Sequence, residues 1–149
     1  MNIGIVFEGG GGKGAYQIGA WKAIRELGIE KYVTCVSGTS VGALNAALFY
    51  MGSLSAAEDL WRSITDDDIL HKKQCDVFEN GDCIFSQVKL SELIDKAIKG
   101  KSKSESCKKC YVTCRYRDKS EYRYFAWSDF YDIELKRKIL LASTAIPVL

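Results

Sequence analysis

The 149-residue chain has little net charge, a single histidine and no long apolar segment. Its 21 basic and 19 acidic residues leave a formal charge of +2, which gives no global field to attract nucleic acid, so we expect no nucleic-acid partner. The longest apolar run, near residues 41–51, is broken by Asn45 and falls short of the roughly 18 residues that cross a bilayer. The N-terminus lacks the basic region and cleavage site of a secretory signal. These absences predict a cytoplasmic protein without a transmembrane helix.

Six cysteines without an export signal predict reduced thiols and not a disulfide framework. The spacing of Cys107, Cys110 and Cys114 invites a zinc interpretation. Against it, no second ligand pair follows at finger spacing, His71 is the only histidine, and Cys110 and Cys114 alternate with Val112 along a predicted strand. We therefore expect buried or half-buried thiols, no metal and no cofactor, and leave open a redox or metal role for the three cysteines.

The first third of the chain alternates between short apolar runs and helical periodicity. We predict a strand at Ile3 to Phe7, an amphipathic helix from Tyr16 to Leu27, a second strand at Tyr32 to Val36, a turn at residues 37–40 and a buried, nearly all-apolar helix from about Val41 to Met51. A strand, a loop, a helix and a second strand begin a βαβ unit, which builds a parallel sheet.

The remaining elements are less regular. Residues 55–58 have the form of a capping box that opens a helix. Further predictions are a helix at Leu90 to Ile98 ended by Gly100, a polar loop at 99–109, a hairpin of strands at 111–116 and 122–127, and a last helix at 133–142. The apolar run at 140–149 differs from an ordinary polar terminus, and we interpret it as a cut inside a domain; a docked terminal strand is the alternative.

One candidate for chemistry is the segment Gly38-Thr39-Ser40-Val41-Gly42, which fits G-x-S-x-G between a predicted strand and a predicted buried helix. In this motif the serine occupies a strained turn, and the flanking glycines allow neighbouring backbone to approach. The turn exposes the hydroxyl at a helix N-terminus, where free N–H groups favour developing negative charge. We predict Ser40 as a catalytic nucleophile; the alternative is a tight turn with an idle serine.

The second candidate is the loop Gly9-Gly10-Gly11-Gly12-Lys13-Gly14 between the first strand and the first helix. A Walker-type phosphate loop is excluded because Gly14 stands where Ser or Thr must follow the lysine. A dinucleotide fingerprint fits the glycines, but the second strand lacks the acidic residue that binds ribose. In the third interpretation the loop supplies backbone donors for an oxyanion beside Ser40, and only this one uses both motifs.

Together the two motifs resemble the patatin-like phospholipase family, with its glycine block near the N-terminus and G-x-S-x-G after the next strand. The segments Ala15-Tyr16-Gln17-Ile18-Gly19, Ala43-Leu44-Asn45-Ala46 and Ala142-Ser143-Thr144-Ala145-Ile146-Pro147 are also similar to that family. The resemblance implies a layered α/β/α sandwich with a mainly parallel sheet, and hydrolysis of fatty acyl esters by a Ser-Asp dyad. The implied substrate is a phospholipid or another acyl-ester lipid, met at a transient membrane surface.

The chain departs from the family in one respect, because it contains no Asp-Gly step to supply the dyad aspartate. We expect that aspartate beyond Leu149, so that residues 1–149 are the N-terminal part of one domain, with weak activity and a truncated edge that favours homodimers or aggregation. If the base lies within the chain, Asp66, Asp67, Asp68 and Asp129 are the candidates. The alternatives are a non-catalytic lipid-binding relic and a dinucleotide-binding domain.

Overall fold

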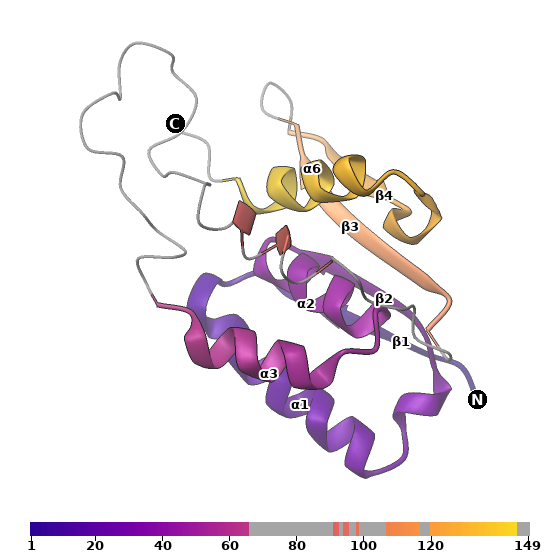
Figure 1. The fold of residues 1–149 in the computed structure, drawn as a ribbon. Helices are drawn as coiled ribbons and strands as arrows, with labels where there is room; N and C mark the ends of the chain where they lie inside the picture. The colour runs from indigo at the N-terminus through magenta and orange to yellow at the C-terminus, as the bar shows by residue number, and fades with distance from the viewer. Residues whose placement is uncertain (66–90, 93, 96–97, 99–106, 117–119, 146–149) are drawn as a thin grey trace.

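The centre of the molecule is a four-stranded sheet with the order β1-β2-β3-β4 (Figure 1). The computed structural model describes residues 1–65, 91–92, 94–95, 98, 107–116 and 120–145. Strands β1 (Ile3–Phe7), β2 (Val33–Thr39) and β3 (Lys109–Arg115) run parallel, and β4 (Tyr122–Phe125) pairs antiparallel with β3. The predicted α/β class with a mainly parallel sheet is confirmed, as is the hairpin.

Helices α1 (Ala15–Glu26), α2 (Val41–Tyr50), α3 (Leu54–Ser63) and α6 (Ile133–Thr144) pack around this sheet. Helix α1 provides the crossover that two parallel strands require. Helix α2 lies against β2 and β3, α3 packs on α1 and α2, and α6 packs on β3 and α2. Short 3-10 turns at Gly11–Gly14, Glu30–Tyr32 and Trp127–Asp129 complete the connections.

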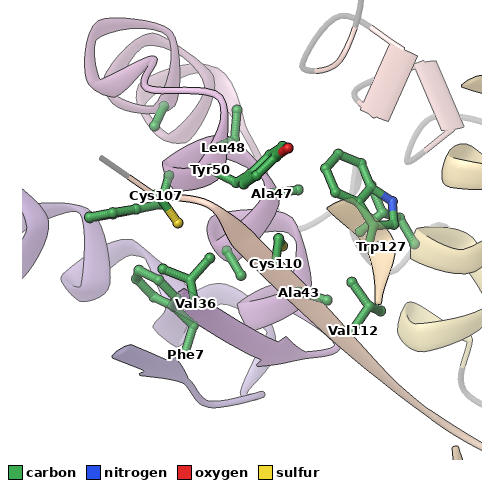
Figure 2. Packing of buried hydrophobic residues seen from close by; sticks show 14 of the residues in the cluster. Phe7, Val36, Ala43, Ala47, Leu48, Tyr50, Cys107, Cys110, Val112 and Trp127 are labelled. Atoms are coloured by element: carbon green, nitrogen blue, oxygen red, sulfur yellow. The ribbon is translucent and has the colours of Figure 1, made fainter. Parts of the chain in front are cut away.

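The core forms where the strands meet α2. Phe7, Val36, Cys110 and Val112 reach from the three parallel strands toward the buried helix (Figure 2). Nine of the ten residues of α2 are buried, which confirms the prediction of a helix enclosed on all sides. The Phe49 ring also lies 4.8 Å from Trp21 of α1 and 5.9 Å from Phe7, centroid to centroid. Helix α2 is therefore firmly held, and so is the residue that precedes it.

The second strand is longer than the sequence pattern predicted. Residues 37–39 were expected in a turn, but Ser37 and Gly38 pair with both β1 and β3, and Thr39 pairs with Thr113 of β3. The predicted turn is wrong because the whole change of direction takes place at one residue, Ser40. Glycine at position 38 had indicated a turn, but in the strand it allows α2 to approach closely.

Two further boundaries were mispredicted. Ser55 lies inside α3, which begins at Leu54 after Ser53, and no side chain caps this helix. Burial of Leu54 and Ala57 sets the start of α3 in place of the expected capping box. The polar loop predicted at 99–109 extends too far at its C-terminal end. Cys107 is fully buried, and the Lys108 N–H donates to the Thr34 carbonyl (2.9 Å), which extends the β2–β3 pairing.

Some predictions fall on residues outside the described ranges. Of the expected helix at 90–98, Ile94 and Ile98 are helical and buried, whereas Gly100 is not described. His71, Asp66, Asp67, Asp68 and Pro147 also lie outside the described residues. None of the helices in the described part of the chain combines the length and hydropathy that a membrane span requires.

Candidate active site

Ser40 is the single residue between β2 and α2, and its backbone is strained. Its φ of 55° and ψ of −129° make it the one non-glycine residue with positive φ in the described part of the chain. Such a conformation costs about 1–3 kcal/mol and persists only where the surroundings enforce it. The strand before and the buried helix after Ser40 provide that enforcement, which is the geometry expected of a G-x-S-x-G turn.

The glycines on either side of Ser40 are required by close backbone contacts. A Cβ added at Gly38 would overlap the Gly42 carbonyl and come within 2.6 Å of the Ala43 nitrogen. A Cβ at Gly42 would overlap the carbonyl oxygens of Phe7 and Glu8. Because both obstacles are backbone, neither can move aside cheaply. The intervening Thr39 is exposed and Val41 is buried, so ordinary side chains fit at these two positions.

The glycine loop begins beside Ser40. A Cβ built on Gly9 would lie 3.4 Å from the Ser40 Cβ and 3.2 Å from the Thr39 carbonyl oxygen. Gly10 and Gly11 have φ values of 156° and 56°, and the Lys13 N–H donates to the Gly10 carbonyl (3.2 Å). A Cβ on Gly11 or Gly12 would have no neighbour within 4 Å, so the middle of the loop faces open space. The exposed Lys13 and buried Gly14 then lead into α1.

A buried amide network ties both ends of this loop to α2. The Asn45 Nδ2 donates to the Gly14 carbonyl (3.0 Å) and to Gln17 Oε1 (2.8 Å), and Trp61 Nε1 donates to Asn45 Oδ1 (2.8 Å). Gln17 Nε2 in turn donates to the carbonyl of Glu8, just before the loop (2.9 Å). Asn45 is fully buried and every hydrogen-bonding group of its side chain has a partner, as a buried polar group requires.

The hydroxyl of Ser143, in the last turn of α6, forms a hydrogen bond with the main chain of Ser40. The Ser40 N–H donates to Ser143 Oγ (2.9 Å), and Ser143 Oγ donates to the Thr113 carbonyl of β3 (2.7 Å). Sequence patterns alone assign no role in the site to Ser143, Gln17 or Asn45. One signal could have singled out Asn45, because it is the only polar side chain in an otherwise apolar helix.

Of the candidate bases, Asp129 lies within the described residues. Asp129 accepts two hydrogen bonds from Lys109 Nζ (2.8 and 2.9 Å). Lys109 pairs with Cys35, four residues before Thr39, so this ion pair is roughly 13 Å away along the strands from the Ser40 end of the sheet. Asp129 is therefore not positioned to take a proton from Ser40. Within the described residues, no carboxylate makes a hydrogen bond to the Ser40 hydroxyl.

Cys107, Cys110 and Cys114 are buried in the core and Cys35 is half-buried, whereas Cys75 and Cys83 lie outside the described residues. Cys110 and Cys114 alternate with Val112 on the buried face of β3, as predicted. Burial raises the pKa of the Cys110 thiol far above its usual range and that of Cys114 to about 11, so both are protonated and unreactive at neutral pH. Cys114 Sγ instead donates to the Ile139 carbonyl (3.5 Å). No group of three His, Cys, Asp or Glu side chains suited to a metal occurs among the described residues.

As a whole, the described arrangement brings a serine and the start of a glycine loop together. A serine lies at the carboxyl end of a parallel strand and at the N-terminus of a buried helix, where the dipole favours an anion. The glycine loop presents main chain beside the serine without side chains in the way. Within the described residues, no aspartate or histidine forms a hydrogen bond with this serine.

Solved structures of known proteins share this fold. The chain is similar to ExoU of the type III secretion system of Pseudomonas aeruginosa, solved in complex with SpcU, with a TM-score of 0.64 and 16% identity over 96% of this chain and 38% of that one. VipD of Legionella pneumophila gives a TM-score of 0.59 and 15% identity over 96% and 41% of the two chains.

Sequence relatives match over a shorter stretch of 48 residues. Identity is 44% to lysophospholipase nte1 of Aspergillus terreus and 52% to neuropathy target esterase sws of Drosophila melanogaster, over 32% of this chain and 3% of those proteins. The chain thus spans a small part of the relatives it matches. The model of the patatin-like phospholipase family, in contrast, matches residues 5–149, and the chain therefore belongs to this family.

Proposed function

We propose that this chain carries the nucleophile and the oxyanion hole of a lipid acyl hydrolase. The observation that carries the proposal is the strained Ser40 at a strand-to-helix junction with the glycine loop beginning at its side. The substrate is a fatty acyl ester of a phospholipid or another acyl-ester lipid, met at a membrane surface. The family, and the names of a lysophospholipase and an esterase among the relatives, support this substrate class.

In the proposed reaction the Ser40 Oγ attacks the acyl carbonyl carbon and forms an acyl-enzyme. The hydroxyl proton passes to a carboxylate base and from there to the leaving alcohol. Water then attacks the acyl-enzyme, the base takes a proton from this water and returns it to the Ser40 oxygen, and the fatty acid is released. Main-chain N–H groups of the loop Gly9–Gly14 face the oxyanion. Removing one donor from such a hole typically lowers turnover about 100- to 1,000-fold, so the loop has to keep its shape.

We further propose that the base is an aspartate outside the described residues, in an Asp-Gly block that the 149-residue sequence does not contain. Asp129 is unsuitable because it is paired with Lys109 at the opposite end of the strands. General-base assistance typically contributes about 100- to 10,000-fold. Residues 1–149 alone are therefore expected to hydrolyse esters slowly, as one part of a larger catalytic domain.

A fluorophosphonate probe and a nitrophenyl ester test the nucleophile. The natural polypeptide, meaning the protein that includes the proposed Asp-Gly block, should be labelled at Ser40 and should hydrolyse the ester. The Ser40→Ala variant should lose both properties. Ser63→Ala is the matched control, because Ser63 is exposed and its hydroxyl donates only to Leu60 of its own helix. Equal activity of Ser40→Ala and the parent would refute the proposal.

Two other outcomes identify the alternatives. Binding of phosphatidylcholine vesicles by a natural polypeptide that neither reacts with the probe nor hydrolyses esters would identify a lipid-binding relic. Tight binding of a dinucleotide that protects the glycine loop would favour a nucleotide-binding domain. Comparing the natural polypeptide with residues 1–149 tests the position of the base: equal rates would place it within this sequence.

A further inference from the structure

The hydroxyl of Ser143 links two main-chain groups, the Ser40 N–H at the turn and the Thr113 carbonyl on β3. It accepts from the Ser40 N–H at 2.9 Å and donates to the Thr113 carbonyl at 2.7 Å. Thr39 and Thr113 are register partners at the end of the β2–β3 ladder. Ser40 is the next residue, and there the chain leaves the sheet. The hydroxyl thus joins the strained turn to β3 just beyond the last register pair of the two strands.

Helix α6 is held so that its last turn reaches this position. Figure 1 shows α6 alongside β3, and the two elements are in contact. Ile139 and Leu140 are buried, and the Ile139 carbonyl accepts from Cys114 Sγ. The neighbouring Thr144 uses its hydroxyl differently, because it donates to the carbonyls of Leu140 and Leu141 in its own helix. Of these two adjacent hydroxyls, only that of Ser143 leaves the helix to contact the turn.

We infer that Ser143 is a positioning residue that holds the main chain of Ser40 in its strained conformation and withdraws the Ser40 amide from the oxyanion donors. The inference deepens the proposed hydrolase function and rests on it. In chymotrypsin-like proteases the amide of the nucleophile is itself an oxyanion donor. Here that amide is already bonded to a side chain, so the donors have to come from other amides, with the glycine loop beside Ser40 as the main source.

The strain at Ser40 explains why such a contact affects rate. Without the Ser143 hydroxyl, the Ser40 N–H loses its acceptor in a partly buried site, and the turn is freer to relax toward an ordinary conformation. Relaxation would move the Ser40 Oγ relative to the glycine loop. A misplacement of about 1 Å costs on the order of 100-fold in rate, whereas substrate binding away from the turn is unaffected.

The test uses three variants of the natural polypeptide: Ser143→Ala, Ser143→Thr and Thr144→Val. For the nitrophenyl ester, we expect Ser143→Ala to lower kcat by about 10- to 100-fold with KM within about threefold of the parent. Ser143→Thr, which keeps a hydroxyl, should recover most of the rate. Thr144→Val removes a neighbouring hydroxyl from the same helix turn and should leave kcat near the parental value.

Amide exchange adds a readout that does not depend on turnover. Hydrogen exchange at the Ser40 amide should be at least about 10-fold faster in Ser143→Ala than in the parent, and unchanged in Thr144→Val. Parental kcat and parental exchange in Ser143→Ala, or an equal loss of rate in Thr144→Val, would overturn the inference. The Ser40→Ala variant separates the two levels: if it is inactive while Ser143→Ala matches the parent, only the role of Ser143 is refuted; if it remains active, the hydrolase proposal fails and this inference fails with it.

Discussion

The two glycine-rich segments of the site use the same residue for different physical reasons. At Gly38 and Gly42 there is no room, because an added Cβ would overlap the backbone of a neighbouring segment. At Gly11 and Gly12 there is open space, and what favours glycine at Gly11 is a φ of 56°. The first pair is therefore a requirement of folding. The glycines at positions 11 and 12 are not required by packing, so we relate them to the function of the loop.

The largest effect is expected at the crowded pair. Gly42→Ala should destabilise the protein by more than about 3 kcal/mol, because the methyl group would overlap the carbonyls of Phe7 and Glu8. Urea unfolding followed by circular dichroism measures the change. The control is Gly19→Ala, in an exposed part of α1 with nothing within 4 Å, which should stabilise the protein by about 0.8–1 kcal/mol. Similar stability of the two variants would show that position 42 has room for a side chain.

The next effect concerns the network that joins the two segments. Asn45→Ala would leave the Trp61 indole N–H, Gln17 Oε1 and the Gly14 carbonyl without the partner they share, at a cost of about 2–4 kcal/mol. Trp61→Phe removes only one of these bonds and should cost less. Because the groups contact one another, the double variant should destabilise by less than the sum of the two. Additive changes in unfolding free energy would show that the contacts are independent.

In the open loop, rate should change more than stability. Gly11→Val should lower turnover of the natural polypeptide by roughly 100-fold, since a β-branched residue resists positive φ and the loop must rotate its N–H groups. Thermal unfolding should show a fold that is still intact. Gly12→Ala is the matched control: Gly12 has no positive φ and no neighbour within 4 Å, so its rate should stay close to the parental one. A parental rate for Gly11→Val would exclude the loop as the oxyanion hole.

The smallest effect is expected at Ser40 itself, and it has the opposite sign. Ser40→Gly relieves a positive φ that glycine adopts freely, which should stabilise the fold by about 1 kcal/mol after the extra chain entropy of glycine is subtracted. Activity should be lost at the same time. A lower unfolding temperature for Ser40→Gly would indicate that the turn is not strained.

Local signals in the sequence were sufficient for much of this fold. The first strand was predicted with its observed bounds, and α2 was predicted as a buried helix within one residue of its observed end, because each is a continuous apolar run that ends near a glycine. The position of Gly9 next to Ser40 also agrees with the expectation from the paired motifs. The start of α3 was missed because the burial of Leu54 and Ala57 decides it, and burial is a tertiary property.

The contacts that support the site could not be read from spacing. Asn45 reaches Gly14 and Gln17 across about thirty residues, and Ser143 reaches Ser40 across 103. Periodicity identifies neighbours three or four residues apart, and it gives no information on partners that are thirty or a hundred residues apart. The roles proposed for Ser40 and the glycine loop remain predictions that the experiments above test.

The bond between Ser40 and Ser143 also has a consequence for biosynthesis. A nascent chain that has emerged only as far as α3 contains Ser40, the glycine loop and the amide network, but neither Thr113 nor Ser143. Ser143 follows Ser40 by 103 residues, a length that the ribosome adds in roughly 5–20 seconds at about 5–20 residues per second. During that interval the Ser40 amide has no Ser143 hydroxyl to bind. The turn therefore acquires its last hydrogen bond late in synthesis, after most of the surrounding core residues have been made.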